Sequence, residues 1–316
     1  MIPASFDYAA PSSLEEAITL LQAHPGARIL AGGHDLLTQM KLHRLAPPLL
    51  IDLREVRGLR GITTLSNPDF LQIGAMTTCT EIALHPEIRT HAAALAEAAD
   101  SIGDVQVRNA STIGGNLAFG DPAADLPAAL LALEASILTQ GAHGPRHIPA
   151  DQFFIGSFRT ALESDEVITS VHIPLPKTGQ RSAYEKFKNP ANGYPVVGVA
   201  VSLLRRDDGT IVSCRLGLTG SEAHPQRLYQ AEEALKGQQA SAAEFAAALR
   251  HIPPFPYVRE SRRLVGLDTL RNADIVRADG RALKNYPTAM ALGEYPVDIH
   301  GSPLHRYLGH DLGSLL

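Results

Sequence analysis

Two glycine pairs constrain the folding of this chain more than any other feature of its sequence. Gly32-Gly33 lies near the N-terminus, and Gly114-Gly115 lies before the middle of the 316 residues. In each case apolar residues precede the pair and a helix-like segment follows it. Glycine tolerates positive φ and leaves room for another group to approach the backbone. Each pair therefore predicts either a turn that is open to a ligand or a plain tight turn between two elements.

The chemistry that two open turns would serve is the binding of a dinucleotide diphosphate, whose oxygens need main-chain N–H groups with no side chain in the way. The first candidate site is Leu30, Ala31, Gly32, Gly33, His34, Asp35 and Leu36, and the second is Thr112, Ile113, Gly114, Gly115 and Asn116. Neither contains G-x-G-x-x-G, and the chain has no lysine-containing P-loop motif. The pattern alone leaves both the ligand and the choice between a binding turn and a plain turn open.

Hydrophobic periodicity predicts strands and helices around these turns. Strands are expected near 28–31, 49–53, 70–75 and 167–173, and helices near 14–21, 35–40, 80–84, 88–102 and 122–135. The strand–helix–strand order at the front predicts a small βαβ-like unit. Further along, strands near 196–203 and 211–218 are joined by an Asp-Asp-Gly turn, and helices are expected near 225–236 and 241–250.

A proline-rich break after the strand near 167–173 divides the chain. Pro174, Pro176 and the following Lys-Thr-Gly mark the best domain boundary. We predict a first domain over 1–176, with subdomains of about 1–55 and 56–176. A second domain then covers 182–250, and 251–316 is a compositionally different tail.

Composition excludes several classes of protein. A net charge of -5 gives no reason to expect nucleic acid as a partner. The two cysteines, Cys79 and Cys214, are too few for an iron–sulfur cluster, which needs about four thiolates. No apolar run approaches the ~18 residues of a membrane span, and no signal peptide is apparent. The expected compartment is the cytoplasm.

Several segments are familiar in the order in which they occur. They are LAGGHDLL at 30–37, QVRNASTIGGNLAFGDPAADLPAALLAL at 106–133, EVITSVHIPLP at 166–176, YEKFKNPANGYPVVGVAVSL at 184–203 and LGLTGSEAHPQR at 216–227. Together they resemble the FAD-binding medium subunit of the xanthine dehydrogenase and carbon monoxide dehydrogenase (molybdenum hydroxylase) family over about residues 1–250. The resemblance implies an α+β fold, with a two-subdomain FAD-binding domain of the vanillyl-alcohol-oxidase (PCMH) type. A smaller α+β domain with an antiparallel sheet and helices would follow.

The resemblance also implies roles for individual residues. Leu30 with residues 31–36, and residues 112–116, would hold the FAD diphosphate and ribityl chain. Asp125 would hydrogen-bond the flavin nucleotide, Ile168 would lie against a flavin ring, and Lys186 would lie near the isoalloxazine. Other interpretations stay open, because Asp125 also fits a helix N-cap, Ile168 a core strand and Lys186 a solvated side chain. No residue is assigned as catalytic or as a metal ligand.

The function implied by the resemblance is that of a flavoprotein oxidoreductase subunit. A large partner subunit would carry the molybdenum cofactor, and a small one would carry [2Fe-2S] clusters. Electrons would pass from those clusters through the FAD of this chain to an acceptor. Two alternatives are a stand-alone flavin enzyme with its own small substrate and a structural subunit without flavin.

The tail departs from the family pattern. YVRESRRLVGLDTLRNADI at 257–275 and ALGEYPVDIHGSP at 291–303 bear a weak similarity to the C-terminal end of another, Rossmann-type family of FAD-dependent oxidoreductases. His300, His305 and His310 recur every five residues, which is not the spacing of one helix face. We expect a solvated polar tail there rather than a metal site.

Overall fold

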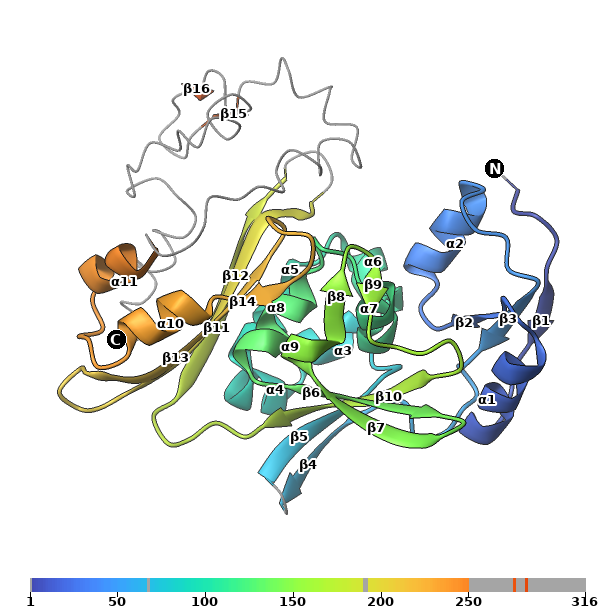
Figure 1. The fold of residues 1–316 in the computed structure, drawn as a ribbon, viewed down its shortest axis with the longest axis horizontal. Coiled ribbons are helices and arrows are strands. Elements are labelled where there is room, and N and C mark those ends of the chain that lie inside the picture. Colours follow the sequence, from blue (N-terminus) through green and yellow to red (C-terminus); the bar gives the residue numbers. More distant parts are fainter. Residues whose placement is uncertain (1, 67–68, 190–192, 250–274, 277–281, 284–316) are drawn as a thin grey trace.

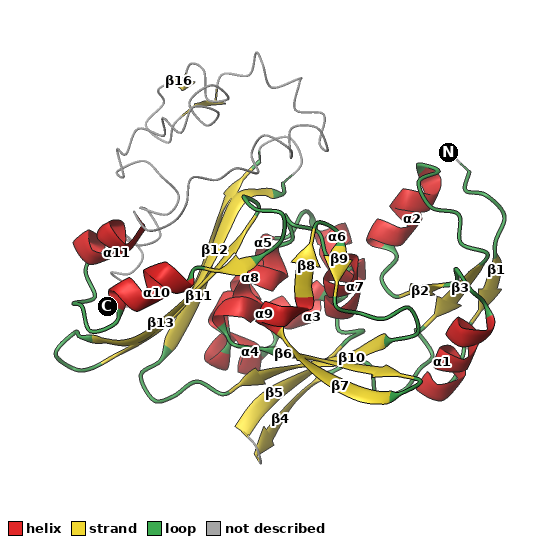
Figure 2. Cartoon of the chain, viewed as in Figure 1, coloured by secondary structure: helices red, strands yellow, loops and turns green. Residues whose placement is uncertain are grey.

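A computed structural model of the chain describes residues 2–66, 69–189, 193–249, 275–276 and 282–283 (Figure 1). Sheets of three, five and four strands follow one another along the molecule, and a group of helices lies between the second and the third (Figure 2). Within the tail, β15 (Ile275–Val276) pairs with β16 (Ala282–Leu283). The tail's three regularly spaced histidines lie outside the described residues.

The N-terminal unit is a small parallel sheet with a helix in each crossover. Its elements are β1 (Asp7–Ala9), α1 (Leu14–Ala23), β2 (Arg28–Leu30), α2 (His34–Lys41) and β3 (Leu49–Asp52). β3 is the central strand and pairs in parallel with both β1 and β2. The predicted βαβ-like unit is therefore confirmed as β2, α2 and β3.

The middle unit is an antiparallel sheet in the order β4-β5-β10-β6-β7. Its strands are β4 (Ile62–Ser66), β5 (Asp69–Gly74), β6 (Ser136–Gly141), β7 (Gly144–Pro149) and β10 (Val167–Pro174). Alternate strand residues such as Leu71, Ile73 and Val171 are fully buried against the helices. One face of the sheet therefore forms the core, as an antiparallel sheet of this kind requires.

Short helices and one small hairpin complete the middle unit. They are α3 (Cys79–Leu84), α4 (Pro86–His91), α5 (Ala93–Ser101), α6 (Val105–Ala110), α7 (Ile113–Phe119), α8 (Asp125–Ala132), α9 (Ala150–Phe153), β8 (Phe154–Gly156) and β9 (Arg159–Thr160). The single helix expected over 88–102 is wrong. Ala92 leaves the helical region with φ -141° and ψ 50°, and Pro86 opens a separate helix.

Periodicity gives no indication of the β6–β7 hairpin. β7 contains Pro145 and Pro149, which argue against a central strand. The structure accommodates both prolines because β7 is the edge strand of its sheet, where a missing N–H leaves no partner unpaired.

The C-terminal unit is a four-stranded antiparallel sheet with two helices. Its elements are β11 (Arg181–Lys188), β12 (Pro195–Arg205), β13 (Ile211–Thr219), β14 (Gln226–Arg227), α10 (Tyr229–Leu235) and α11 (Ala242–Leu249). The predicted β12–β13 hairpin is confirmed, and Gly209 of its turn has φ +84°. The helix expected from 225 begins only at Tyr229, because Gln226 and Arg227 pair with β13.

Helix α8 joins the middle unit to the C-terminal sheet. All eight of its residues are buried. A Cβ on Gly217 of β13 would lie 2.0 Å from the carbonyl oxygen of Ala128, so strand and helix backbone touch directly. The observed α+β architecture agrees with the predicted fold class.

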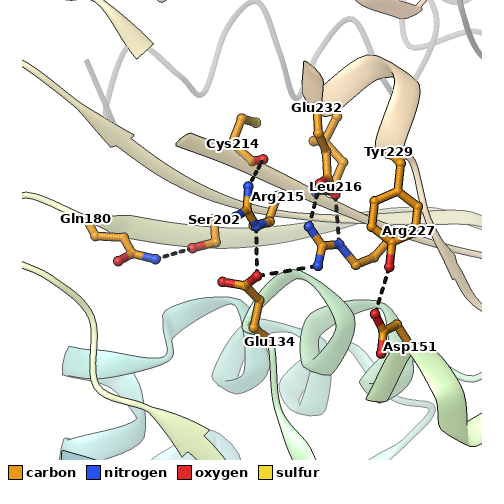
Figure 3. A network of polar contacts seen from close by, with 10 residues as sticks. All are labelled: Glu134, Asp151, Gln180, Ser202, Cys214, Arg215, Leu216, Arg227, Tyr229 and Glu232. Carbon is orange, nitrogen blue, oxygen red and sulfur yellow. Dashed lines mark hydrogen bonds and ion pairs between the residues drawn. The ribbon is translucent and has the colours of Figure 1, made fainter. Parts of the chain in front are cut away.

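Ionic contacts reinforce the same junction (Figure 3). The Glu134 carboxylate, just past α8, accepts hydrogen bonds from Arg215 Nε at 2.9 Å and Arg227 Nη1 at 3.4 Å. The Tyr229 hydroxyl donates to Asp151 Oδ2 at 2.7 Å. In the described part of the chain, no helix has both the length and the apolar character needed to cross a bilayer.

Candidate functional site

A cleft of about 540 Å³ lies between the N-terminal unit and the middle unit. Both glycine turns line it, the first through residues 31–36 and the second through Thr112, Gly114, Gly115 and Asn116. Strand β10 runs beneath the cleft. Its Val167 packs into the N-terminal core and its Ile168 into the middle core, because successive strand residues point to opposite faces.

The first turn presents main-chain N–H groups that have no partner. Gly33 is the N-cap of α2, has φ +76°, and provides no side-chain cap. Among the described residues, the N–H groups of residues 32–36 donate no hydrogen bond, and the first amide of this helix to do so is Leu37 N, to Gly33 O. An uncapped helix N-terminus of this kind carries partial positive charge and fits an anion.

Glycine is also needed where the two turns meet. A Cβ on Gly32 would lie 2.0 Å from the Ala110 carbonyl oxygen, just before the second turn. A Cβ on Gly115 would face the Ala31 methyl group at 3.8 Å. The backbones of the two turns therefore approach each other closely, and no side chain fits at Gly32.

The second turn differs from the first in its hydrogen bonds. Four of its five N–H groups donate to a protein acceptor at 2.8–3.1 Å: Ile113 to Thr77 O, Gly114 to Ala75 O, Gly115 to Thr112 Oγ1 and Asn116 to Thr112 O. A Cβ on Gly114 would lie 2.7 Å from the Ala75 methyl group. The expectation that the amides of both turns would be open is thus met only at the first turn.

Asn116 contributes an unsatisfied acceptor to the cleft wall. Its Oδ1 atom is buried and has no hydrogen-bond partner among the described residues. A buried oxygen of this kind normally finds a donor. Open amides on one side and an orphaned acceptor on the other suit a ligand that carries both phosphate oxygens and hydroxyl groups.

Two of the predicted site residues, Leu30 and Ile113, do not line the cleft. Leu30 ends strand β2, and Ile113 is fully buried. Ile168 is a buried residue of strand β10 and also lines the cleft, so its core-strand interpretation is confirmed.

Asp125 and Lys186 do not line this cleft but bind each other. Lys186 Nζ donates to Asp125 Oδ2 at 3.0 Å, and the Tyr184 hydroxyl donates to Asp125 Oδ1 at 2.6 Å. The N-cap interpretation of Asp125 is wrong, because Ala124 is the N-cap of α8. The Lys186 side chain is only 5% exposed, so it is not a solvated lysine. Burial raises the pKa of Asp125 and lowers the pKa of Lys186, and the opposite charge of each partner counters both shifts.

Further carboxyl groups gather near the end of α7. Burial, with a smaller contribution from the negative charges of Asp35 and Asp125, raises the pKa of Asp121 to about 6. Burial also raises the pKa of Asp35, which lines the cleft. The region is therefore acidic as well as open to an anion.

Two aromatic residues that line the cleft were not predicted from the sequence. Phe158 and Phe119 both line it, with ring centroids 5.2 Å apart in an edge-to-face arrangement. Phe158 has φ +53°, a left-handed conformation that is rare for a bulky residue and often marks a functional site. No local pattern in Gly156-Ser157-Phe158 predicts that conformation.

A second cavity, of about 640 Å³, lies where the middle unit meets β11 and β12, and neither glycine turn lines it. We therefore assign the turn-lined cleft as the candidate site.

Comparison with known proteins gives this cleft a context. Residues 4–176 match the family described as "FAD binding domain in molybdopterin dehydrogenase", and residues 182–253 match the "CO dehydrogenase flavoprotein C-terminal domain". The carbon monoxide dehydrogenase medium chain of Hydrogenophaga pseudoflava is 41% identical over 69% of this chain and 76% of its own length. The nicotine 6-hydroxylase medium subunit of Paenarthrobacter nicotinovorans is 36% identical over 76% of this chain and 83% of its own length.

A solved structure agrees with these sequence matches. A chain of the H. pseudoflava carbon monoxide dehydrogenase, in a form that lacks the Mo-pyranopterin moiety of the molybdenum cofactor, superposes with a TM-score of 0.76 at 40% identity. The match covers 79% of this chain and 87% of the other. This chain belongs to the family of FAD-binding medium subunits of the xanthine dehydrogenase and carbon monoxide dehydrogenase type.

Proposed function

We propose that this chain binds one FAD in the turn-lined cleft and serves as the electron-transfer subunit of a molybdenum-cofactor hydroxylase complex. The observation that carries the proposal is the row of open N–H groups at residues 32–36, which faces a cleft also lined by the second turn. Such a row suits a diphosphate, which is the part that FAD shares with other dinucleotides.

The residues of the site divide the work of holding the cofactor. Open amides of Gly32, Gly33, His34, Asp35 and Leu36 would bind the diphosphate, with Leu30 and Ala31 supporting the turn. Thr112, Gly114, Gly115 and Asn116 would form the opposite wall, with Ile113 buried in the core behind them. The Asn116 amide oxygen would accept from a hydroxyl group of the ribityl chain or ribose. When bound, FAD supplies the ability to accept and release electrons.

The isoalloxazine end of the site would be built by three groups of residues. Ile168 would lie against the flavin, and Phe158 and Phe119 would exclude water from the cleft mouth. Asp125 would act on the flavin nucleotide together with Lys186, whose ammonium group it holds 3.0 Å away. Neither side chain lines the cleft, so this pair would support the flavin site without touching the cleft lining.

The partners of this subunit follow from its relatives, which are medium chains or subunits of dehydrogenases and hydroxylases. We propose a hetero-oligomer in the cytoplasm with a large molybdenum-cofactor subunit and a small subunit that carries [2Fe-2S] clusters. Cys79 and Cys214 lie buried in two different cores, so they cannot share one cluster. The separation of the two cysteines agrees with iron–sulfur clusters that are carried by a partner chain.

The domain division is part of the same proposal. We place the FAD-binding domain at 1–176, with subdomains of about 1–55 and 56–176, and a C-terminal domain at 182–250. The three sheets and their separate buried cores support these limits.

The first test compares two glycines that have the same backbone strain. Gly33→Val and Gly179→Val both place a branched residue at positive φ, +76° in the cleft and +81° in open space at the domain linker. We expect Gly33→Val to bind FAD on the order of 100-fold more weakly, because a branched residue at this φ, with its Cβ 3.0 Å from Leu37 Cδ1 and 3.2 Å from Leu30 Cδ1, would displace the turn that carries the open amides. Gly179→Val should bind FAD like the unaltered chain.

The measurement is a titration of the folded, flavin-free chain with FAD, followed by quenching of flavin fluorescence. Equal affinity in both variants would reject this placement of the diphosphate. A folded chain that takes up no FAD at all would favour a structural subunit. Reduction of bound FAD by a small substrate, without partner subunits, would favour a stand-alone enzyme.

A further inference from the structure

Asp35 places a carboxyl group inside the proposed diphosphate site. It is the second residue of α2, within the turn whose amides are open, and it lines the cleft. No described residue donates a hydrogen bond to its carboxylate. Burial raises the pKa of Asp35, and only the adjacent His34 acts in the opposite direction.

The surroundings of Asp35 are acidic. Negative charge on Asp35 acts on Asp121 and on Tyr194, so both lie near it, and Asp125 lies near that pair as well. Lys186 is taken up by its bond to Asp125 at 3.0 Å. On its own helix, the ionisable neighbour in sequence is His34.

Two more charged residues line the cleft at a different position. Glu166 is bound to Arg146 Nη1 at 2.8 Å, and Arg28 Nη1 donates to the Ala27 carbonyl oxygen at 3.3 Å. Neither the Glu166 carboxylate nor the Arg28 guanidinium makes a hydrogen bond to Asp35 in the described structure. Within the described residues, Asp35 therefore has no hydrogen-bonded cation, and only His34 favours its ionised form.

A diphosphate brings about two negative charges into this turn. Two like charges about 4 Å apart repel by about 4 kcal/mol at an effective dielectric constant near 20. An ionised Asp35 would oppose binding, whereas a protonated Asp35 offers an O–H donor to a phosphate oxygen. The open amides and the carboxyl group can act on the same anion only if the carboxyl group is neutral.

We propose that Asp35 binds the FAD diphosphate as the neutral acid, so that FAD binding takes up a proton. The proposal rests on the function proposed above and specifies the ionisation state of one of its binding residues. The bound anion favours the protonated form, so Asp35 holds its proton to a higher pH with FAD than without it. FAD affinity therefore falls as pH rises through this interval, by up to about tenfold per pH unit.

The direct experiment measures protons on the unaltered full-length chain. FAD is titrated into the flavin-free protein by calorimetry at about pH 6.5 in two buffers with different ionisation enthalpies, and the difference gives the protons taken up. We expect net uptake of a substantial fraction of one proton per FAD. Zero or negative uptake, together with an FAD dissociation constant that stays flat from about pH 5 to about pH 8, would overturn the proposal.

Variants assign the proton to its residue. Asp35→Asn keeps the shape and removes the titration, so we expect tighter binding at the upper end of the range and a flattened pH dependence. His34→Gln is the matched control, because it replaces the neighbouring ionisable residue of the same turn and leaves Asp35 in place. Retention of the slope in Asp35→Asn with its loss in His34→Gln would reject Asp35 as the group.

Three additions keep the test independent of folding and of the proposed function. If Asp35→Asn does not fold, Asp35→Ser removes the same titrating group. Asp121→Asn is a second control, because burial raises the pKa of Asp121 to about 6, and it should keep the slope. ADP-ribose carries a diphosphate that is esterified at both ends, without the flavin, and should show the same proton uptake as FAD. A chain that binds neither FAD nor ADP-ribose at any pH contradicts the proposed function, whereas binding without proton uptake contradicts only the role of Asp35.

Discussion

The two glycine turns have nearly the same sequence pattern and opposite hydrogen-bonding states. At Gly32-Gly33 the following helix begins with no side-chain cap, and its first amides are open. At Gly114-Gly115 the helix has Thr112 as its N-cap, and the Thr112 hydroxyl accepts a hydrogen bond from Gly115 N at 3.1 Å. The N–H groups of Ile113 and Gly114 donate to the carbonyl oxygens of Thr77 and Ala75. The first turn is therefore the one that we propose as the binding surface, whereas the amides of the second turn are used in structural contacts with residues 75–77.

The difference shows why a Gly-Gly pair is ambiguous in sequence. Glycine at 33 is required by positive φ beside open amides, whereas glycine at 114 is required because another backbone segment lies against it. Both positions therefore require glycine, but for two different physical reasons. Substitutions can distinguish these two reasons.

Gly114→Ala should have the largest effect on folding. Its Cβ would lie 2.7 Å from the Ala75 methyl group and 2.8 Å from the Ala75 carbonyl oxygen, and backbone cannot move aside cheaply. We expect a loss of about 3 kcal/mol in the free energy of unfolding, measured by urea denaturation. Gly156→Ala, whose Cβ would meet the Arg159 side chain at 3.8 Å, is the control and should change stability by less than about 0.5 kcal/mol. Similar stability of the Gly114→Ala and Gly156→Ala variants would contradict the structural role of the second turn.

Thr112→Val tests the structural role of the second turn with a smaller expected loss of stability. The substitution removes the N-cap of α7, and we expect it to lower the free energy of unfolding by about 1 kcal/mol. FAD affinity should fall by less than about tenfold, because the first turn is untouched. A loss of affinity as large as that expected for Gly33→Val would show that the second turn binds the diphosphate equally, and the contrast between the turns would fail.

The elements that sequence reasoning finds are those determined by neighbours along the chain. The βαβ-like unit and the β12–β13 hairpin follow from local periodicity and turn residues. The closed state of the second turn does not, because two of its four acceptors, Thr77 O and Ala75 O, lie more than thirty residues away. The Asp125–Lys186 pair spans a separation of 61 positions for the same reason.

The site residues also divide into those that local sequence predicts and those that depend on tertiary contacts. Residues 31–36 could be placed at a cleft from a glycine pair before a helix start. Phe158 could not, since its positive φ is imposed by a tertiary contact, its N–H donating to the Gly120 carbonyl oxygen at 2.9 Å.

Hydrogen–deuterium exchange on the full-length chain, with and without FAD, tests the contrast between the turns most directly. Peptides that cover residues 32–36 should exchange fast without FAD and be strongly protected with it, because their amides gain acceptors only from the ligand. Peptides that cover residues 113–116 should be protected in both states, with little change. Protection at 113–116 that appears only with FAD, or amides at 32–36 that stay unchanged when FAD is bound, would contradict the account.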